Sequence, residues 1–211
     1  MIAHALHIVV NELNKHFTDQ FQAPANRVVE GNIGMGVNGA ALGNVPAEKI
    51  ILSVVNYKEE KTLKNLPHYV RNDSALKVTY ENPPVFINFM ILMTATHSDY
   101  LNALIDLSRI IRFFQSQNVF TPETVSPLSV ALDPVKFNPL DSLESFKLIF
   151  DLYSPSFEEV NHMWGTLGGK QYPFVMYLMR MLELKFRVIQ SESGVVTEIQ
   201  RDFFHTYTAR S

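Results

Sequence analysis

Apolar positions along the chain fall into runs with the spacing of strands and helices. The run Val85–Met93 is apolar at every position except Asn88. It is too short to cross a bilayer, which takes about 20 apolar residues, but it has the length of a strand buried on both faces. A long stretch of helical spacing follows over residues 98–117. This strand-and-helix block is the most informative feature of the sequence.

A second block, residues 146–188, repeats the order as strand, helix and strand. Its helix is predicted to start at Phe157, after Ser154-Pro155-Ser156, and to end at Gly168-Gly169. Another amphipathic helix is predicted at residues 2–17. From these elements we expect an α/β fold with a single mixed β-sheet of about four to five strands flanked by helices. Strand-like patterns occur at residues 50–57, 75–80, 85–95, 128–132, 146–153 and 172–188. The segment 75–80 is predicted to be a short edge strand.

The predicted helix at 98–117 is apolar on more than one face. Its main stripe is accompanied by a second group of apolar residues centred on Ile105 and Phe113. Such a helix is either sandwiched within the monomer, the commoner case, or contacts another subunit through its second face. Ser98 is predicted to cap the helix, with Asp99 in the first turn. Ile105 and Phe113 are therefore candidate subunit-interface residues.

Residues 18–46 contain five glycines and no periodic pattern after the first helix. Loops of this length are uncommon and are usually functional or disordered, so we expect a flexible glycine-rich loop here. The mixed-charge run 58–61 predicts a solvated turn, and the polar stretch 62–82 predicts a long connection. The expected organisation is an α/β domain at 1–190 followed by a C-terminal tail at 191–211.

Composition excludes several classes of protein. With 46% apolar residues among 211, the chain can form a core and is not globally disordered. A net charge of −3 provides no basic surface for nucleic acid or anionic lipid. The absence of cysteine removes disulfides, zinc–thiolate sites and thiol nucleophiles. The N-terminus lacks the basic segment of a signal peptide, so we expect cytoplasmic synthesis without secretion by the general route.

Gly34, Gly36 and Gly39 match the G-x-G-x-x-G pattern of dinucleotide-binding loops. In such loops the amide groups at the start of a helix bind a pyrophosphate. Here only a weak strand pattern at 27–30 precedes the glycines, and Pro46 would stop the required helix within about two turns. We interpret the match as a decoy in a flexible loop, and we predict no cofactor.

No other group of residues forms a recognisable site. Gly168-Gly169-Lys170 lacks the upstream glycine and the hydroxyl residue of a phosphate-binding loop. His4 and His7 share a helical face but have no acidic partner at metal-ligand spacing. His97 and Asp99 lie at a strand-to-helix junction, where α/β enzymes place active sites, but no G-x-S-x-G motif accompanies them. We predict no catalytic residue and no metal site, which favours a role in assembly or binding.

The order and spacing of several segments carry a family resemblance. These segments are 50–57 followed by Leu63-Lys64-Asn65, then Pro83–Ala95, Tyr100–Phe114, Leu152-Tyr153, Val160–Trp164 and Tyr172–Leu184. Together they resemble the cap or terminator proteins of contractile injection systems, the phage-tail-like particles of the virulence-cassette and antifeeding-prophage type. The resemblance covers most of residues 1–187. In the family, the strand after the proline pair usually has leucine and tyrosine around a polar residue, where this chain has Val85-Phe86-Ile87-Asn88-Phe89.

The resemblance implies a compact α/β domain that forms a ring, expected to be a hexamer, at the distal end of the inner tube. There it would stop tube growth and anchor the last sheath ring. Its implied partners are other copies of itself, the inner tube protein and the sheath protein, without nucleic acid and without direct membrane insertion. Assembly in the cytoplasm would precede its incorporation into a particle.

The tail after residue 191 is predicted to reach a neighbouring subunit by strand addition. Val195, Thr197 and Ile199 alternate as in a strand, and Phe203-Phe204 is an apolar pair with no other predicted role. Phe203 and Phe204 are therefore further candidate interface residues.

Two alternative functions stay open at this point. A tail terminator of an ordinary phage or prophage would need the same kind of surface, because it also closes the open end of a helical stack. An enzyme or nucleotide-binding α/β domain would instead use the Gly34–Gly39 loop, in which case the chain would bind a nucleotide.

Overall fold

The computed structural model describes residues 1–37, 45–63, 67–72, 76–132, 137–143, 145–184, 191–194 and 201. The chain forms two compact units. The larger unit comprises Met1–Leu63 and Val85–Leu184, and the smaller comprises Lys64–Pro84 and Lys185–Ser211. These units do not coincide with the predicted division at residue 190, because residues 64–84 leave the larger unit.

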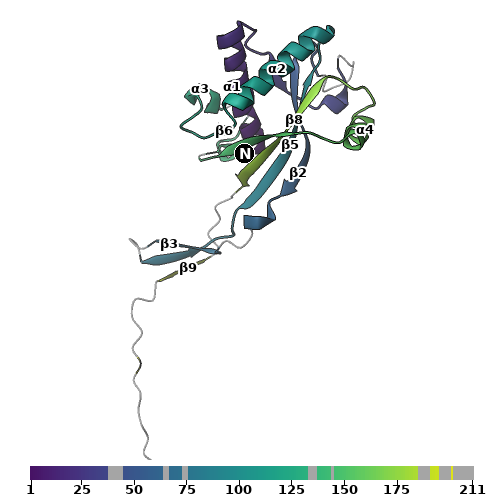
Figure 1. The fold of residues 1–211 in the computed structure, drawn as a ribbon. Coiled ribbons are helices and arrows are strands. Elements are labelled where there is room, and N and C mark those ends of the chain that lie inside the picture. Colours follow the sequence, from purple (N-terminus) through teal and green to yellow (C-terminus); the bar gives the residue numbers. More distant parts are fainter. Residues whose placement is uncertain are drawn as a thin grey trace, which may run out of the picture. The chain divides into compact units, whose positions relative to one another are not determined.

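The larger unit is built on a six-stranded mixed sheet in the order β1-β2-β5-β8-β7-β6 (Figure 1). Only β1 and β2 run parallel, and the other neighbours are antiparallel. The predicted α/β class is confirmed, with more strands than expected. The two edge strands, three and two residues long, are too short to give a periodic pattern. The strands are β1 Val28–Glu30, β2 Ile50–Glu59, β5 Val85–Ala95, β6 Val119–Phe120, β7 Leu148–Tyr153 and β8 Phe174–Leu184.

Helices pack on both faces of this sheet. Neighbouring residues of β5 enter different clusters: Ile91 joins the cluster with α1 and α2, whereas Leu92 joins the cluster with Trp164 of α4. Successive strand side chains point to opposite faces, so α1 and α2 cover one face and α4 the other. Ile91–Ala95 is buried on both faces, which explains the continuous apolar sequence there, whereas Val85 at the start of the strand is 47% exposed. The helices are α1 Ile2–Phe21, α2 Tyr100–Ser116 and α4 Phe157–Thr166.

Local sequence signals explain where these helices begin and end. In α4, Ser156 and Glu159 form a reciprocal capping box, and Gly168 and Gly169 follow the helix with φ angles of 104° and 76°. The predicted start and end of this helix are confirmed. In α2, the cap is Asp99 and not Ser98: the Asp99 carboxylate accepts the Leu101 N–H at 3.0 Å. The Ser98 hydroxyl instead donates to the carboxylate of Glu48.

Three other predictions were wrong in detail. The predicted strand at 128–132 is a short helix, α3 Pro127–Val130, because Pro127 at its first turn has the fixed φ of a helix start. Strand β2 continues to Glu59, so the charged run 58–61 is only in part a turn. The region 18–46 is more ordered than a single loop, since it holds the end of α1, strand β1 and the 3-10 helix η1 Ile33–Met35.

Aromatic rings form the centre of the core beneath α2. The ring of Phe114 lies 4.8 Å from that of Phe150 and 4.4 Å from that of Tyr177. Phe113 is also in this core, with 3% of its surface exposed and its ring 5.0 Å from that of His16. The prediction of Phe113 as an interface residue is therefore corrected, because its side chain is buried within the monomer.

The smaller unit contains a three-stranded antiparallel sheet in the order β3-β4-β9. Its strands are β3 Tyr69–Asn72, β4 Lys77–Tyr80 and β9 Ser191–Gly194. The predicted short strand at 75–80 is thus confirmed, although the stretch 62–82 is more than a connection. None of the side chains whose burial is described in this unit is buried.

Candidate functional site

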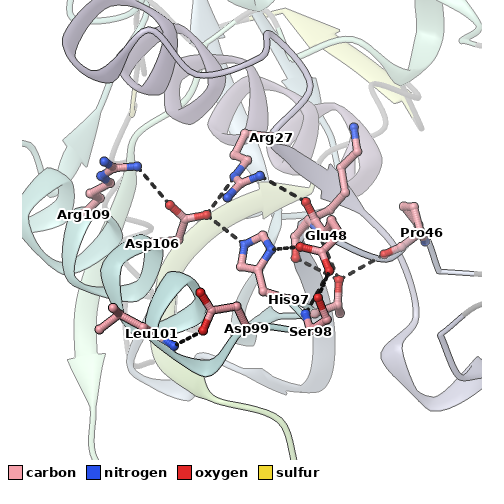
Figure 2. A network of polar contacts seen from close by, with 11 residues as sticks. Arg27, Pro46, Glu48, His97, Ser98, Asp99, Leu101, Asp106 and Arg109 are labelled. Carbon is pink, nitrogen blue, oxygen red and sulfur yellow. Dashed lines mark hydrogen bonds and ion pairs between the residues drawn. The ribbon is translucent and has the colours of Figure 1, made fainter.

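A network of polar contacts lies where strand β5 leads into helix α2, at the junction singled out by the sequence (Figure 2). It joins the segment before β1, the segment before β2, the link between β5 and α2, and the second and third turns of α2. Its central members are Arg27, Glu48, His97, Asp106 and Arg109.

Asp106 is the centre of the cluster and is only 1% exposed. Its Oδ2 accepts a hydrogen bond from Arg27 Nε at 2.7 Å and lies 2.9 Å from His97 Nε2. Its Oδ1 accepts from a terminal guanidinium nitrogen of Arg109 at 3.1 Å. The Arg109 guanidinium also lies over the ring of Phe21, 4.3 Å from its centroid. A buried carboxylate requires such partners, because an unpaired charge in the core is costly.

Glu48 closes the outer side of the cluster. Its Oε1 accepts from the Ser98 hydroxyl at 2.6 Å and from the Ser98 amide at 2.9 Å, and its Oε2 lies 3.1 Å from His97 Nδ1. The Ser98 hydroxyl, followed by the Ser98 amide and His97, lowers the pKa of Glu48 to about 2. Arg27 reinforces the same turn by donating to the Glu48 carbonyl at 3.2 Å.

This arrangement has the residue types of a catalytic triad without its connectivity. In a triad, the histidine accepts the proton of the nucleophilic hydroxyl. Here each ring nitrogen of His97 faces a carboxylate, which only accepts hydrogen bonds, and the Ser98 hydroxyl donates to Glu48. The cluster therefore fastens segments that are far apart in the sequence, and it offers no base to a substrate.

The sequence located this cluster only in part. His97 was singled out at the junction and belongs to it, whereas Asp99 is the helix cap. Asp106 was missed, although a carboxylate between Ala103 and Leu107 on the apolar stripe of a helix signals a buried ion pair. Arg27 and Glu48 carried no local signal, because they lie 79 and 49 residues from their respective partners.

The glycine motif does not present free amides to a phosphate. The Gly34 N–H donates to the Asn32 side chain at 3.0 Å, and the Gly36 N–H donates to the Ile33 carbonyl at 3.1 Å. The first glycine, Gly34, lies inside a three-residue 3-10 helix, Ile33–Met35, and does not precede a longer helix. Gly39 lies outside the described residues. Among the described residues, the motif thus lacks the open helix start that pyrophosphate binding needs.

His4 and His7 have separate roles. His4 is 1% exposed, and its ring spans two segments: Nε2 lies 2.9 Å from the Val130 carbonyl, while Nδ1 accepts the Leu143 amide at 2.9 Å. Burial lowers its pKa from the ordinary value. His7 pairs with Glu30 at 3.1 Å on the surface. Within the described ranges, no three histidine or acidic residues converge as metal ligands.

An apolar surface remains on the outside of α2. Ile105, predicted as an interface residue, is 39% exposed, and the stripe around it includes Leu101, Leu104 and Ile111. The other predicted interface residues, Phe203 and Phe204, lie outside the described residues. No helix within the described ranges is both long and apolar enough to span a bilayer.

One comparison with known proteins identifies a family, and another identifies similar solved folds. A family model described as the Pvc16 N-terminal domain matches residues 5–198. A search of the curated proteins gives no significant match. One similar solved structure is the sheath/tube terminator, in the extended state, of an extracellular contractile injection system, PVC. It has a TM-score of 0.54 and 12% identity, over 94% of this chain and 64% of that chain.

A second similar structure is the tube-terminating cap of the anti-feeding prophage, AFP. It has a TM-score of 0.53 and 13% identity, over 92% of this chain and 60% of that chain. The chain therefore spans less than two thirds of the length of either solved protein. At these identities the two structures establish a shared fold.

Proposed function

The chain belongs to the family of the Pvc16 N-terminal domain, and from this premise we propose that it is a structural cap of a contractile injection system. In this role it closes the distal end of the inner tube and anchors the last ring of the sheath. The observation that carries the proposal is the family match over residues 5–198. It is supported by two solved tube-terminating proteins, whose fold matches nearly the whole of this chain.

Ending a tube is a task for protein surfaces. A growing helical stack presents an open, heterologous interface at its end. A terminator must match that interface on one side and must not reproduce it on the other. This task needs complementary surfaces and no reacting groups. The side chains of the His97 cluster, which bind one another, are consistent with such a role, so we propose that the protein is not an enzyme.

The finer parts of the proposal concern assembly. We propose a ring, expected to be a hexamer, that contacts the inner tube protein on one side and the sheath protein at its rim. Ile105 and the exposed stripe around it are proposed to contribute to contacts between subunits, together with the tail 191–211. Assembly is proposed to occur in the cytoplasm, after which the protein is part of a phage-tail-like particle.

Deletion of the gene is the direct test. Without a cap, tubes are expected to vary in length, and sheaths are expected to contract early or fail to polymerise. Particles from the complemented strain should show this protein at the end opposite the baseplate by electron microscopy of a tagged chain. Particles of normal length and sheath state from the deletion strain would exclude the cap function. Capsid genes beside this gene would assign the same function to an ordinary phage tail.

A further inference from the structure

Phe157 is the most exposed of the large apolar side chains in the described part of the chain, with 87% of its surface accessible. It is the first residue of α4, but it does not fix the start of that helix. Ser156 and Glu159 do so through their reciprocal hydrogen bonds at 3.3 and 2.8 Å, and Tyr153 donates to Glu159 at 2.9 Å. Phe157 is therefore held in place by its neighbours while its ring contributes almost nothing to the core.

An open groove of about 410 Å³ lies elsewhere on the same unit. One wall comes from α2 and the other from the segment that enters β8, and most of its surface is apolar. Its lining residues are Tyr100, Leu104, Leu107, Gln171, Tyr172, Pro173 and Phe174. Tyr100 and Leu104 are 66% and 40% exposed, so the groove leaves apolar surface uncovered in the single chain.

Charges beside the two features are complementary. Glu158 follows Phe157 and Lys170 precedes Gln171 of the groove, and both side chains are exposed without a hydrogen-bond or ion-pair partner among the described residues. Asp99, which precedes Tyr100 of the groove, already accepts the Leu101 amide. Seating Phe157 in the groove would therefore bring an unused carboxylate towards an unused ammonium group.

The two features lie near opposite ends of α4. This helix has ten residues, so Phe157 is separated from the start of the β8 segment by roughly 15 Å of helix. A contact between two different surfaces is heterologous, and it closes into a ring or continues as a chain when copies add head to tail.

We propose that Phe157 of one copy inserts into the groove between α2 and residues 171–174 of the next copy, with Glu158 facing Lys170 across the contact. The inference rests on the proposed function, which requires a ring, and it names the two surfaces that form it. Phe157 supplies the aromatic anchor typical of interface hot spots, and the exposed stripe of α2 adjoins the groove.

The absence of cysteine allows a clean cross-linking test. Full-length chains carrying Glu158→Cys are mixed with chains carrying Lys170→Cys, at high protein concentration and in assembled particles, and then oxidised. The mixed disulfide should exceed by at least about tenfold the yield obtained when Glu158→Cys chains meet Leu128→Cys chains. Leu128 is a matched control because it is 84% exposed on α3. Adding Phe157→Ala should lower the mixed yield at least about tenfold without changing the thermal stability of the chain.

Three results would overturn the contact. One is a mixed yield no higher than that of the Leu128→Cys control. Another is a predominance of symmetric dimers of the Glu158→Cys chain. The third is preferred coupling of Lys170→Cys chains to Phe203→Cys chains, which would assign the groove to the tail. Protein found at the tube end without the mixed disulfide would reject this contact and retain the cap function. Absence of the protein from the tube end would reject the cap function. The yield of the mixed disulfide in solution would still show whether the contact forms.

Discussion

In the six-stranded sheet, β5 sends successive side chains into two hydrophobic clusters, whereas in the sheet β3-β4-β9 none of the described side chains is buried. The larger sheet is covered by helices on both faces. In the smaller sheet, Tyr69 and Tyr80 face each other across β3 and β4 but remain 52% and 41% exposed. Small sheets with no buried face are marginally stable in water. Burial within the described chain therefore accounts for the stability of the larger unit and does not account for that of the smaller one.

Phe150→Ala, in the core of the larger unit, is expected to have the largest effect on stability. Phe150 is 2% exposed, and its ring packs against those of Phe114 and Phe120 at 4.8 and 5.5 Å. Its truncation should lower the free energy of unfolding by about 3–5 kcal/mol, measured by urea denaturation followed by circular dichroism. The control is Leu152→Ala, on the same strand and 57% exposed, which should change stability by less than about 0.5 kcal/mol. Equal effects of the two substitutions would contradict the assignment of the core.

Asp106→Ala should destabilise the larger unit by about 3 kcal/mol, since it leaves the buried His97 and the guanidinium of Arg27 without their shared carboxylate. Asp99→Ala is the matched control: it removes a carboxylate from the same helix but costs only the cap, about 1 kcal/mol. The difference between the two midpoints of denaturation measures how much the cluster contributes to stability. If Asp99→Ala lowers the midpoint as much as Asp106→Ala does, the cluster has no special role in stability.

His4 should make the stability of the larger unit depend on pH. Burial lowers its pKa in the folded chain, so below the ordinary value of 6.5 the unfolded chain binds a proton that the folded chain does not. Stability is therefore expected to fall as pH falls below 6.5 and to level off below the folded pKa. His4→Gln should cost about 1–3 kcal/mol at pH 7.5 and flatten this slope.

The partly exposed His7, which pairs with Glu30, provides the control for this test. His7→Gln should leave most of the slope in place when denaturation midpoints are compared between pH 7.5 and pH 5. An unchanged slope in His4→Gln would show that another group causes the dependence.

Tyr80→Ala should have the smallest effect, less than about 1 kcal/mol, because it removes cross-strand pairing at a position that is 41% exposed. Hydrogen exchange sharpens the comparison further. Amides of β3 and β4 are expected to exchange well before those of β5, whose hydrogen bonds lie beneath buried side chains. Protection in β3 equal to that in β5 would refute the contrast between the two sheets.

Local patterns predicted elements well where one chemical signal dominated. The apolar run at 85–95 and the start signals around Phe157 gave a strand and a helix that the structure confirms. The same reasoning failed at 128–132, where Pro127 outweighed the strand-like residues after it. It also failed for Phe113, since helical spacing defines a stripe but not which neighbours cover it. The buried face of α2 combines residues from both predicted stripes.

The sequence by itself determined the fold class, the main strands and helices, and the family resemblance, because these depend on the order and period of apolar residues. Tertiary structure alone decided that Arg27, Glu48 and His97 meet around Asp106, that His4 bridges two distant segments, and that Phe157 lies exposed. His97 and Asp106 are nine positions apart, but the other contacts join residues dozens of positions apart. Their formation depends on how strands and helices pack, and no local pattern of side chains specifies that packing.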